Sequence, residues 1–160
     1  TTGDLDVALN AMNSAQQPHH FLGISQEGSS SVIQTSGNNF FHLVLRGGSS
    51  GPNFDAVSIH NASDELAAGG LPKAIMIDCN HANSGKDPGR QELVLRNLIL
   101  QIIDGNQSII GTMIESNING GNQPISMKMK YGVSVTDACL DWNNTQRILL
   151  NAKDSLKNKQ

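Results

Sequence analysis

The strongest constraint on the fold is an alternation of apolar, strand-like runs with amphipathic, helix-like segments along the chain. Apolar residues recur at helical spacing in four segments, and proline or glycine closes the first two. We expect these helices at residues 4–17, 55–68, about 89–103 and from about Thr145 onward. The main strand-like runs are FHLVLRGG (41–48), KAIMIDCN (73–80) and SIIGTMIE (108–115). This alternation predicts an α/β fold, a parallel sheet with helical crossovers.

The strand-like runs are almost continuously apolar, which is typical of parallel strands with both faces covered. A further short strand is expected at HFLGIS (20–25), followed by a β-hairpin arm at SSVIQTSGN (30–38). Four parallel strands with four helices fit either a small doubly wound sheet or half of an eight-stranded barrel. Composition leaves both open. In either case residues 1–160 are expected to form one domain.

Charge and composition exclude several classes of partner. A net charge of -3 offers no basic field for a phosphate backbone, so we expect no nucleic-acid partner. The longest apolar runs are far shorter than the roughly 20 residues of a membrane-spanning helix, so we expect no membrane partner. Cys79 and Cys139 lie in apolar stretches, which favours reduced thiols and a cytoplasmic protein. The opening TTGDLDVALN has no targeting-peptide features, and we interpret the sequence as a fragment.

Polar side chains follow the C-terminal ends of the main strands. Arg46 follows HLVL, Asp78 and His81 follow AIMI, Glu115 follows IIGTMI, and Asp137 lies beyond the last glycine-rich loop. Ligands bind at this end of parallel α/β sheets. A neutral imidazole with two carboxylates suits Mn, Fe, Co or Zn, so His81, Glu115 and Asp137 form a candidate divalent-metal set. The alternative is a structural histidine with two carboxylates that cap a turn and a helix.

Two further residues near these strand ends have a functional and a structural interpretation. Arg46, followed by two glycines, has a guanidinium fork suited to an anion, with backbone amides free to approach it. The alternative is a surface arginine next to a glycine turn. Cys139 follows Asp137 by two residues and would approach a metal if the chain is extended there, although a small core residue is the simpler interpretation.

Four motifs in order, HLVLRGG, MIDCNHANSGK, IIGTMIESNINGGNQ and KYGVSVTDACLDW, closely resemble the C-terminal part of the type I DAHP synthase (phospho-2-dehydro-3-deoxyheptonate aldolase) family. The resemblance covers nearly the whole chain. It implies that residues 1–160 are the last four β/α units of a (β/α)8 TIM barrel with a β-hairpin insertion. The N-terminal half is then absent, because such a barrel needs about 250 residues.

The resemblance also implies an activity. Members of this family condense phosphoenolpyruvate with erythrose 4-phosphate and release phosphate, in the first step of the shikimate pathway. By resemblance, His81, Glu115 and Asp137 are metal ligands, Arg46 contacts the phosphoenolpyruvate phosphate, and Asp137 also lies at the substrate. The metal is expected to polarise or position the aldehyde as a Lewis acid. A homo-oligomer, dimer or tetramer, is expected as well.

This chain departs from the family pattern in several places. The family's fourth ligand, a cysteine, and a phosphoenolpyruvate-binding lysine belong to the first half of the barrel, so we expect the 160 residues alone to be inactive. Thr2 stands where the family usually has Asp, and Asn80 where it usually has Ser. The loop from Gly121 to Lys130 is shorter than in similar members. These differences concern loop contacts rather than the ligands.

Family members are commonly inhibited by an aromatic amino acid that binds near a strand and hairpin similar to residues 20–38. The resemblance makes Phe21, Gly23 and Ile33 candidate allosteric contacts. Gly23 resembles tyrosine-sensitive members, whereas Ser there resembles phenylalanine-sensitive ones, so we expect feedback inhibition by tyrosine. Two alternatives remain: a related phosphoenolpyruvate-sugar phosphate synthase, and a non-catalytic module that binds an aromatic amino acid.

Overall fold

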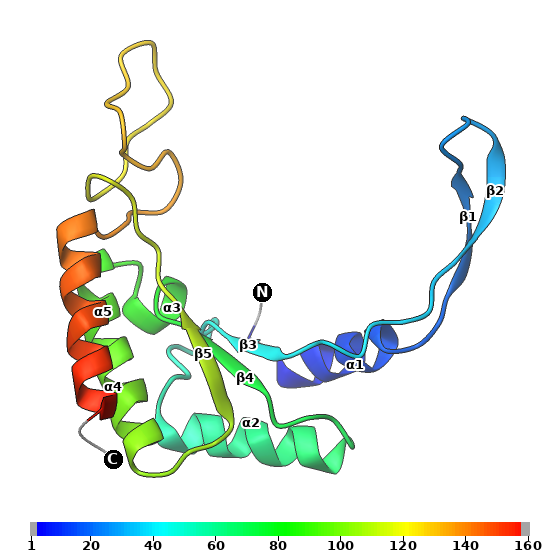
Figure 1. Ribbon diagram of the computed structural model, residues 1–160, viewed down its shortest axis with the longest axis horizontal. Coiled ribbons are helices and arrows are strands. Elements are labelled where there is room, and N and C mark those ends of the chain that lie inside the picture. The colour runs from blue at the N-terminus through cyan, green and yellow to red at the C-terminus, as the bar shows by residue number, and fades with distance from the viewer. Residues whose placement is uncertain (1–2, 158–160) are drawn as a thin grey trace.

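A three-stranded parallel sheet with strand order β3–β4–β5 forms the centre of the molecule (Figure 1). The computed structural model describes residues 3–157, so Thr2 lies outside the described residues. The strands are β1 (His20–Ile24), β2 (Ser30–Gln34), β3 (Leu43–Leu45), β4 (Ile75–Asp78) and β5 (Ile109–Met113). The helices are α1 (Leu5–Ala15), α2 (Ala56–Ala68), α3 (His81–Ser84), the 3-10 helix η1 (Pro88–Arg90), α4 (Gln91–Ile103) and α5 (Trp142–Lys157). The predicted α/β class is confirmed.

One face of the sheet is buried against the helices. Leu43 and Leu45 of β3 alternate with an exposed residue, and Ile75 and Ile77 of β4 have no exposed surface. They share one core cluster with residues from the helices that follow the strands: Ile59, Ala62 and Leu66 of α2, Val94, Leu95 and Leu98 of α4, and Ile148 of α5. Each large aliphatic side chain buried this way contributes about 1.5–3 kcal/mol. This cluster therefore packs α2, α4 and α5 together with one face of the sheet.

The opposite face of the sheet is open. Val44 of β3 is 39% exposed and Ile110 of β5 is 54% exposed. Between them Met76 reaches over Gly111, where a Cβ atom would lie 3.3 Å from the methionine Cε. The expectation that both faces are covered is therefore wrong for residues 3–157. The reason is that both crossover helices, α2 and α4, pack in the same core cluster on one side.

The connecting helices begin and end at clear sequence signals. Asp55 caps α2, because its side chain accepts hydrogen bonds from the backbone amides of Val57 and Ser58. The same helix ends at Gly69, as its two following glycines predicted. Helix α5 is joined to α4 by Arg147, which donates two hydrogen bonds of 2.8 and 2.7 Å to the carboxylate of Glu92. No helix of residues 3–157 combines the length and apolar character needed to cross a membrane.

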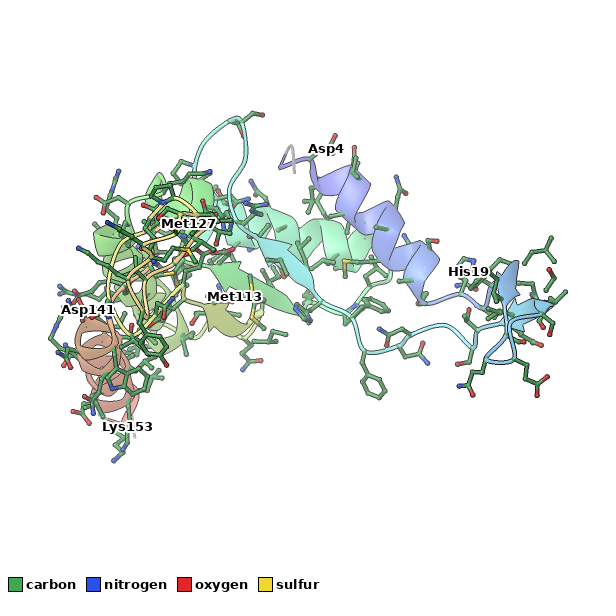
Figure 2. All side chains as sticks on the ribbon, turned by 90° about the horizontal axis from the view of Figure 1, so that it is seen from above. Asp4, His19, Met113, Met127, Asp141 and Lys153 are labelled. Carbon is green, nitrogen blue, oxygen red and sulfur yellow. The ribbon has the colours of Figure 1, made fainter. Side chains whose placement is uncertain are left out.

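An antiparallel hairpin of β1 and β2 stands apart from the sheet, beyond His19 (Figure 2). Phe21 pairs directly with Ile33 in this hairpin, which confirms the predicted hairpin arm. Its base is attached to α1: the Nε2 atom of His19 lies 2.8 Å from the carbonyl oxygen of Ser14, and the amide of Asn38 donates to the carbonyl of Ala15. The hairpin is thus held at its base and exposed along its length.

Two expectations about the C-terminal part need correction. Three parallel strands form the sheet among the described residues, not four, because the segment after β5 makes only isolated bridges, such as Ser116 with Leu140. Helix α5 begins at Trp142 rather than near Thr145, because the Asp141 side chain accepts from the amide of Asn144 and caps the first turn.

Candidate metal centre and substrate site

His81 lies just beyond the C-terminal end of β4, at the first residue of α3. The strand ends at Asp78, and the backbone of His81 has a φ of 51°, a left-handed conformation that is uncommon for a residue with a side chain. This turn brings the His81 ring back to the strand end, where Nδ1 lies 2.8 Å from Oδ2 of the buried Asp78. His81 therefore lies outside the strand, because this local contact reverses the chain.

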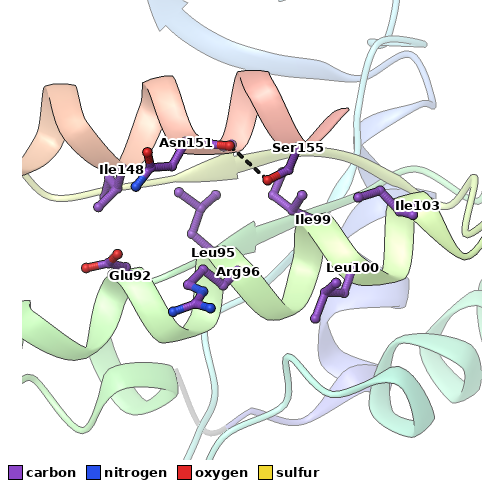
Figure 3. A pocket seen from close by; sticks show the side chains of 10 residues that line it. Glu92, Leu95, Arg96, Ile99, Leu100, Ile103, Ile148, Asn151 and Ser155 are labelled. Atoms are coloured by element: carbon purple, nitrogen blue, oxygen red, sulfur yellow. Dashed lines mark hydrogen bonds between the residues drawn. The ribbon is translucent and has the colours of Figure 1, made fainter. Parts of the chain in front are cut away.

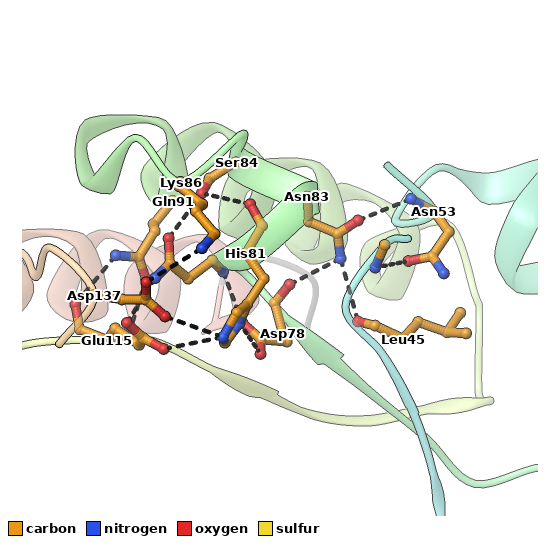
Figure 4. Close-up of polar contacts among 12 residues, drawn as sticks. Leu45, Asn53, Asp78, His81, Asn83, Ser84, Lys86, Gln91, Glu115 and Asp137 are labelled. Atoms are coloured by element: carbon orange, nitrogen blue, oxygen red, sulfur yellow. Dashed lines mark hydrogen bonds and ion pairs between the residues drawn. The ribbon is translucent and has the colours of Figure 1, made fainter. Parts of the chain in front are cut away.

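The other ring nitrogen of His81 faces two carboxylates (Figure 4). Its Nε2 atom lies 3.6 Å from Oε1 of Glu115 and 3.5 Å from Oδ2 of Asp137. One ligand atom from each of the three residues lies within 4.8 Å of the others. Two ligands bound to one ion at about 2.1 Å are themselves separated by roughly 3.0–3.5 Å. The distances from His81 Nε2 and the nitrogen and oxygen donors therefore make the three residues a group that could hold a divalent metal.

Glu115 is held in place by a buried glutamine of α4, the helix that precedes β5. The side chain of Gln91, which has no exposed surface, donates to the carbonyl of Glu115 at 3.1 Å and accepts from its amide at 2.8 Å. The Glu115 carbonyl also accepts from the amide of Leu140, which brings the segment containing Asp137 alongside. These backbone contacts bring Glu115 and Asp137 together although they are far apart in sequence.

A second buried side chain contacts the Glu115 carboxylate. Asn80, also without exposed surface, donates from Nδ2 to Oε2 of Glu115 at 2.7 Å. Its own Oδ1 accepts from the hydroxyl of Ser84 at 2.8 Å, and its backbone amide donates to Oδ1 of Asp78 at 2.8 Å. Asn80 therefore contacts the ligand candidate Glu115 directly and contacts the ligand candidate His81 through Asp78.

The loop after β3 is connected to the same site through a pair of asparagines. The buried Asn83 donates to the carbonyls of Leu45 and Asp78 and accepts from the amide of Asn53 at 2.8 Å. Asn53 in turn accepts from the amide of Gly47 at 2.7 Å. A Cβ atom at Gly47 would lie 2.7 Å from the Cβ of Ala82, so glycine permits the close approach. The loop that carries Arg46 is thus fixed beside α3.

A model of the DAHP synthetase I family matches residues 3–150. The chain belongs to this family. It is 48% identical over 152 residues to the Tyr-sensitive phospho-2-dehydro-3-deoxyheptonate aldolase of Escherichia coli, covering 93% of this chain and 42% of that protein. It is 41% identical over 169 residues to the phenylalanine-inhibited enzyme of Saccharomyces cerevisiae, covering 100% of this chain and 46% of that protein.

The fold is similar to that of a solved member of the same family. The structure of phospho-2-dehydro-3-deoxyheptonate aldolase from Francisella tularensis matches with a TM-score of 0.92 and 39% sequence identity. The match covers 100% of this chain and 47% of that chain. The chain therefore spans somewhat less than half the length of each of these three proteins.

Lys86 belongs to the site of this family member, although the sequence did not single it out. It follows Gly85, and both residues have left-handed backbones, with φ of 65° and 63°. This turn places Lys86 Nζ 3.6 Å from Oδ1 of Asp137, on the side of the carboxylate away from His81 (Figure 4). The Lys86 side chain is 69% exposed. A cation here offsets negative charge at the ligand set and offers a contact for an anionic substrate.

Arg46 lies at a different part of the site from the three metal-ligand candidates. It is half-buried in the loop after β3 and lines a small cavity.

 The volume of that cavity is about 280 Å³, and α1 forms its other wall through Leu5 and Ala8. The contacts of Asn53 with Gly47 and with Asn83 connect the loop that carries Arg46 to α3.

The two cysteines lie close to the site but keep their thiols protonated. Burial, with a smaller contribution from Asp78, raises the pKa of Cys79 to about 12. Burial also raises the pKa of Cys139, and the nearby carboxylates of Glu115 and Asp137 act in the same direction. Cys139 Sγ donates to the carbonyl of Asp137 at 3.5 Å. Both cysteines therefore act as small packing residues, as the simpler interpretation of Cys139 predicted.

A separate groove of about 420 Å³ lies between α4 and α5, away from the ligand set (Figure 3). Leu95 and Ile99 of α4 face Ile148 of α5 along it, and polar groups such as Arg96 and Asn151 lie at its edges. It contains none of the residues that the sequence predicted for the site. We assign it no part in the chemistry.

The predicted allosteric residues meet on one face of the hairpin. Phe21 and Ile33 are a cross-strand pair, and Gly23 lies two residues along β1 on the same face. The end of the Ile33 side chain fills the space beside Gly23, because a Cβ atom there would lie 2.2 Å from Ile33 Cδ1. Phe21 is 50% exposed. The three residues form a continuous apolar surface that is open to solvent.

Proposed function

We propose that this chain is the C-terminal half of a phospho-2-dehydro-3-deoxyheptonate aldolase, or DAHP synthase, which condenses phosphoenolpyruvate with erythrose 4-phosphate and releases phosphate. The observation that carries the proposal is the convergence of His81, Glu115 and Asp137 at the C-terminal ends of parallel strands, in a member of the DAHP synthetase I family. Ligand sites in parallel α/β folds lie at this end of the strands.

The open face of the sheet supports a half-barrel architecture. Val44 and Ile110 are exposed on the face opposite the helices, which is the face that points into the interior of a (β/α)8 barrel. The β3 and β5 edges of the sheet are unpaired among residues 3–157. We propose that further strands of a longer protein close the barrel, that the β1–β2 hairpin is an insertion in it, and that the complete protein is a cytoplasmic homo-oligomer, dimer or tetramer.

The residues of this chain have distinct roles in the proposed reaction. When bound, a divalent metal (Mn, Fe, Co or Zn) supplies a Lewis acid beside the aldehyde of erythrose 4-phosphate. His81, Glu115 and Asp137 would hold it, and Asp137 also faces Lys86. Arg46 binds the phosphate of phosphoenolpyruvate with its guanidinium fork. Catalysis by these groups consists mainly of positioning two anionic substrates and offsetting their repulsion.

The bond changes of the reaction balance without a redox partner. C3 of phosphoenolpyruvate forms a bond to the aldehyde carbon of erythrose 4-phosphate, and the aldehyde oxygen takes up a proton. Water adds to C2 of the former enolpyruvate, and inorganic phosphate leaves from that carbon. Both substrates carry phosphate, so cationic groups such as Arg46 and Lys86 are expected at the site.

We further propose that tyrosine inhibits the complete enzyme by binding at Phe21, Gly23 and Ile33. Two kinds of support are available. These side chains form one exposed apolar surface on the hairpin, which suits an aromatic ring. The similar protein of Escherichia coli is named Tyr-sensitive, whereas that of Saccharomyces cerevisiae is named phenylalanine-inhibited.

The experiment that tests the proposed function is phosphoenolpyruvate consumption by the longest natural form of this chain. The assay contains erythrose 4-phosphate and Mn²⁺, with and without EDTA, and a parallel reaction contains arabinose 5-phosphate. We expect consumption with erythrose 4-phosphate, abolished by EDTA and by His81→Ala. His60→Ala, on the exposed surface of α2, is the matched control and should retain activity. Absence of consumption by a folded, Mn²⁺-loaded protein would reject the proposal.

A further inference from the structure

We propose that Asn80 is a positioning residue for the metal centre, which holds Glu115 with one carboxylate oxygen directed to the ligand set. This inference rests on the proposed function. Asn80 has no exposed surface, and its Nδ2 donates to Oε2 of Glu115 at 2.7 Å. The other oxygen, Oε1, faces His81 Nε2 at 3.6 Å. The hydrogen bond therefore occupies one oxygen of Glu115 and leaves the other for a metal.

The orientation of the Asn80 amide follows from its two partners. The carboxylate of Glu115 has only acceptors, so it requires the NH₂ side of the amide. On the opposite side, the Ser84 hydroxyl donates to Asn80 Oδ1 at 2.8 Å. The reversed amide would bring Oδ1 against a carboxylate oxygen and lose the hydrogen bond to Glu115. Because Asn80 and Ser84 are both fully buried, the Asn80 amide must find its partners within the protein, and this arrangement satisfies both of its ends.

Asn80 also connects the supports of two separate ligands. Its backbone amide donates to Oδ1 of Asp78 at 2.8 Å, and Oδ2 of the same carboxylate contacts His81 Nδ1 at 2.8 Å. The side chain of Asn80 contacts Glu115. This single residue therefore orients both Asp78, which is the partner of His81, and Glu115. Outer partners of metal ligands typically change metal affinity by about 10–100-fold when they are removed.

The size of the side chain is essential to this role. A serine at position 80, the residue that the family resemblance leads one to expect, is shorter and places its hydroxyl near the position of the asparagine Cγ. It therefore cannot span the distance from the α3 backbone to Glu115 Oε2 while Ser84 is retained as a partner. Asn80 gives this chain a restraint on Glu115 that serine does not provide.

The test compares Mn²⁺ binding by the wild type and Asn80→Ser in the longest natural form of the chain, with free Mn²⁺ measured by EPR. We expect the Kd for Mn²⁺ to rise about 10–100-fold in Asn80→Ser. Gln101→Ala is the matched control: Gln101 is a buried amide on α4 whose contacts, to Phe54 and Asn97, lie away from the ligand set. It should lower Tm without changing the Kd.

A double-mutant comparison separates positioning from general destabilisation. If Asn80 acts through Glu115, Asn80→Ser should weaken Mn²⁺ binding by only about threefold or less in a Glu115→Gln background, because the charge of the acceptor is already lost. In an Asp137→Asn background it should retain its full effect. A purely structural role predicts the full effect in both backgrounds.

Two outcomes overturn different parts of this inference. Equal Mn²⁺ affinity in the wild type and Asn80→Ser, or full additivity with Glu115→Gln, would reject the role of Asn80 and leave the proposed metal centre standing. Absence of Mn²⁺ binding by the folded wild type, with no further loss in His81→Ala, would reject the metal centre and the role of Asn80 with it.

Discussion

The Nδ1 atom of His81 lies 2.8 Å from Oδ2 of Asp78, and this contact determines which ring nitrogen faces the other two ligand candidates. An ionised carboxylate can only accept, so the proton of a neutral imidazole is on Nδ1. The lone pair of Nε2 is then directed to the space beside Glu115 and Asp137. A buried aspartate thus orients the His81 ring as the proposed metal centre requires, although Asp78 is not one of the ligand candidates.

Replacement of Asp78 by Asn should weaken metal binding through His81. The amide can present an NH₂ group to Nδ1, which favours the tautomer with the proton on Nε2. We expect the Kd for Mn²⁺ to rise about 10–100-fold. Isothermal titration with Mn²⁺ measures this change, and the His60→Ala protein provides the control for loss of an exposed histidine. Unchanged affinity in Asp78→Asn would contradict the assigned tautomer.

Replacement of Lys86 by Met should affect metal and substrate binding in opposite directions. The Lys86 ammonium lies 3.6 Å from Asp137 and repels a bound cation, so Mn²⁺ should bind severalfold more tightly in Lys86→Met at low salt. The same change should raise the KM for phosphoenolpyruvate, because an attractive charge is lost. Lys153→Met, on α5, is the matched control. If Lys86→Met weakened the binding of both Mn²⁺ and phosphoenolpyruvate, or strengthened both, this account would be contradicted.

Gly23 is predicted to determine which aromatic amino acid inhibits the complete enzyme. The side chain of a serine at this position must displace Ile33, whose Cδ1 lies 2.2 Å from the place of the added Cβ. We expect wild-type inhibition by tyrosine and a shift toward phenylalanine in Gly23→Ser, by tenfold or more in the ratio of the two inhibition constants, on the order of 1.4 kcal/mol.

Inhibition assays with both amino acids measure this ratio. Gly28→Ser, in the hairpin turn where a φ of 79° makes a side chain strained, tests whether disturbing the hairpin alone changes the ratio. Inhibition of the wild type by phenylalanine but not by tyrosine would reject the proposed effector. Retention of the tyrosine preference in Gly23→Ser would reject the role of this glycine.

Loss of the α2 cap should lower stability in a way that depends on pH. The side-chain hydrogen bond from Ser58 is the largest cause of the lowered pKa of Asp55, relative to its ordinary value of 3.8. Asp55→Ala should therefore reduce the free energy of unfolding at pH 7 by about 0.5–2 kcal/mol. Because the folded-state pKa is depressed, the charged form stabilises the protein above pH 3.8, and that contribution is lost as the pH falls through the folded value.

Urea unfolding at pH 7 and under acid conditions measures this dependence. The difference between wild type and Asp55→Ala should shrink as the pH falls below 3.8. Asp55→Asn retains an oxygen that can cap the helix but cannot ionise, so it should preserve most of the stability and remove the pH dependence. A difference between wild type and Asp55→Ala that grows at low pH would contradict the assignment.

Local sequence patterns were sufficient for most of the elements. The periodicity and capping signals of residues 55–68 predict α2 closely, and the alternation in SSVIQ predicts β2. The error in the number of parallel strands arose where long-range contacts override a local pattern. The segment before α5 pairs with the chain after β5 by isolated bridges rather than as a strand. Contacts of this kind have no signature in short-range periodicity.

The sequence by itself determined the α/β class, the residue types of the metal-ligand candidates and, through its motifs, the family. Only the tertiary structure decided how those ligands are held. Gln91 and Glu115 are 24 residues apart, and Asn80 and Glu115 are 35 apart, yet both pairs form direct hydrogen bonds. Hydrogen bonds act over about 3 Å, so their partners are set by the packing of β4, α4 and β5 rather than by spacing along the chain.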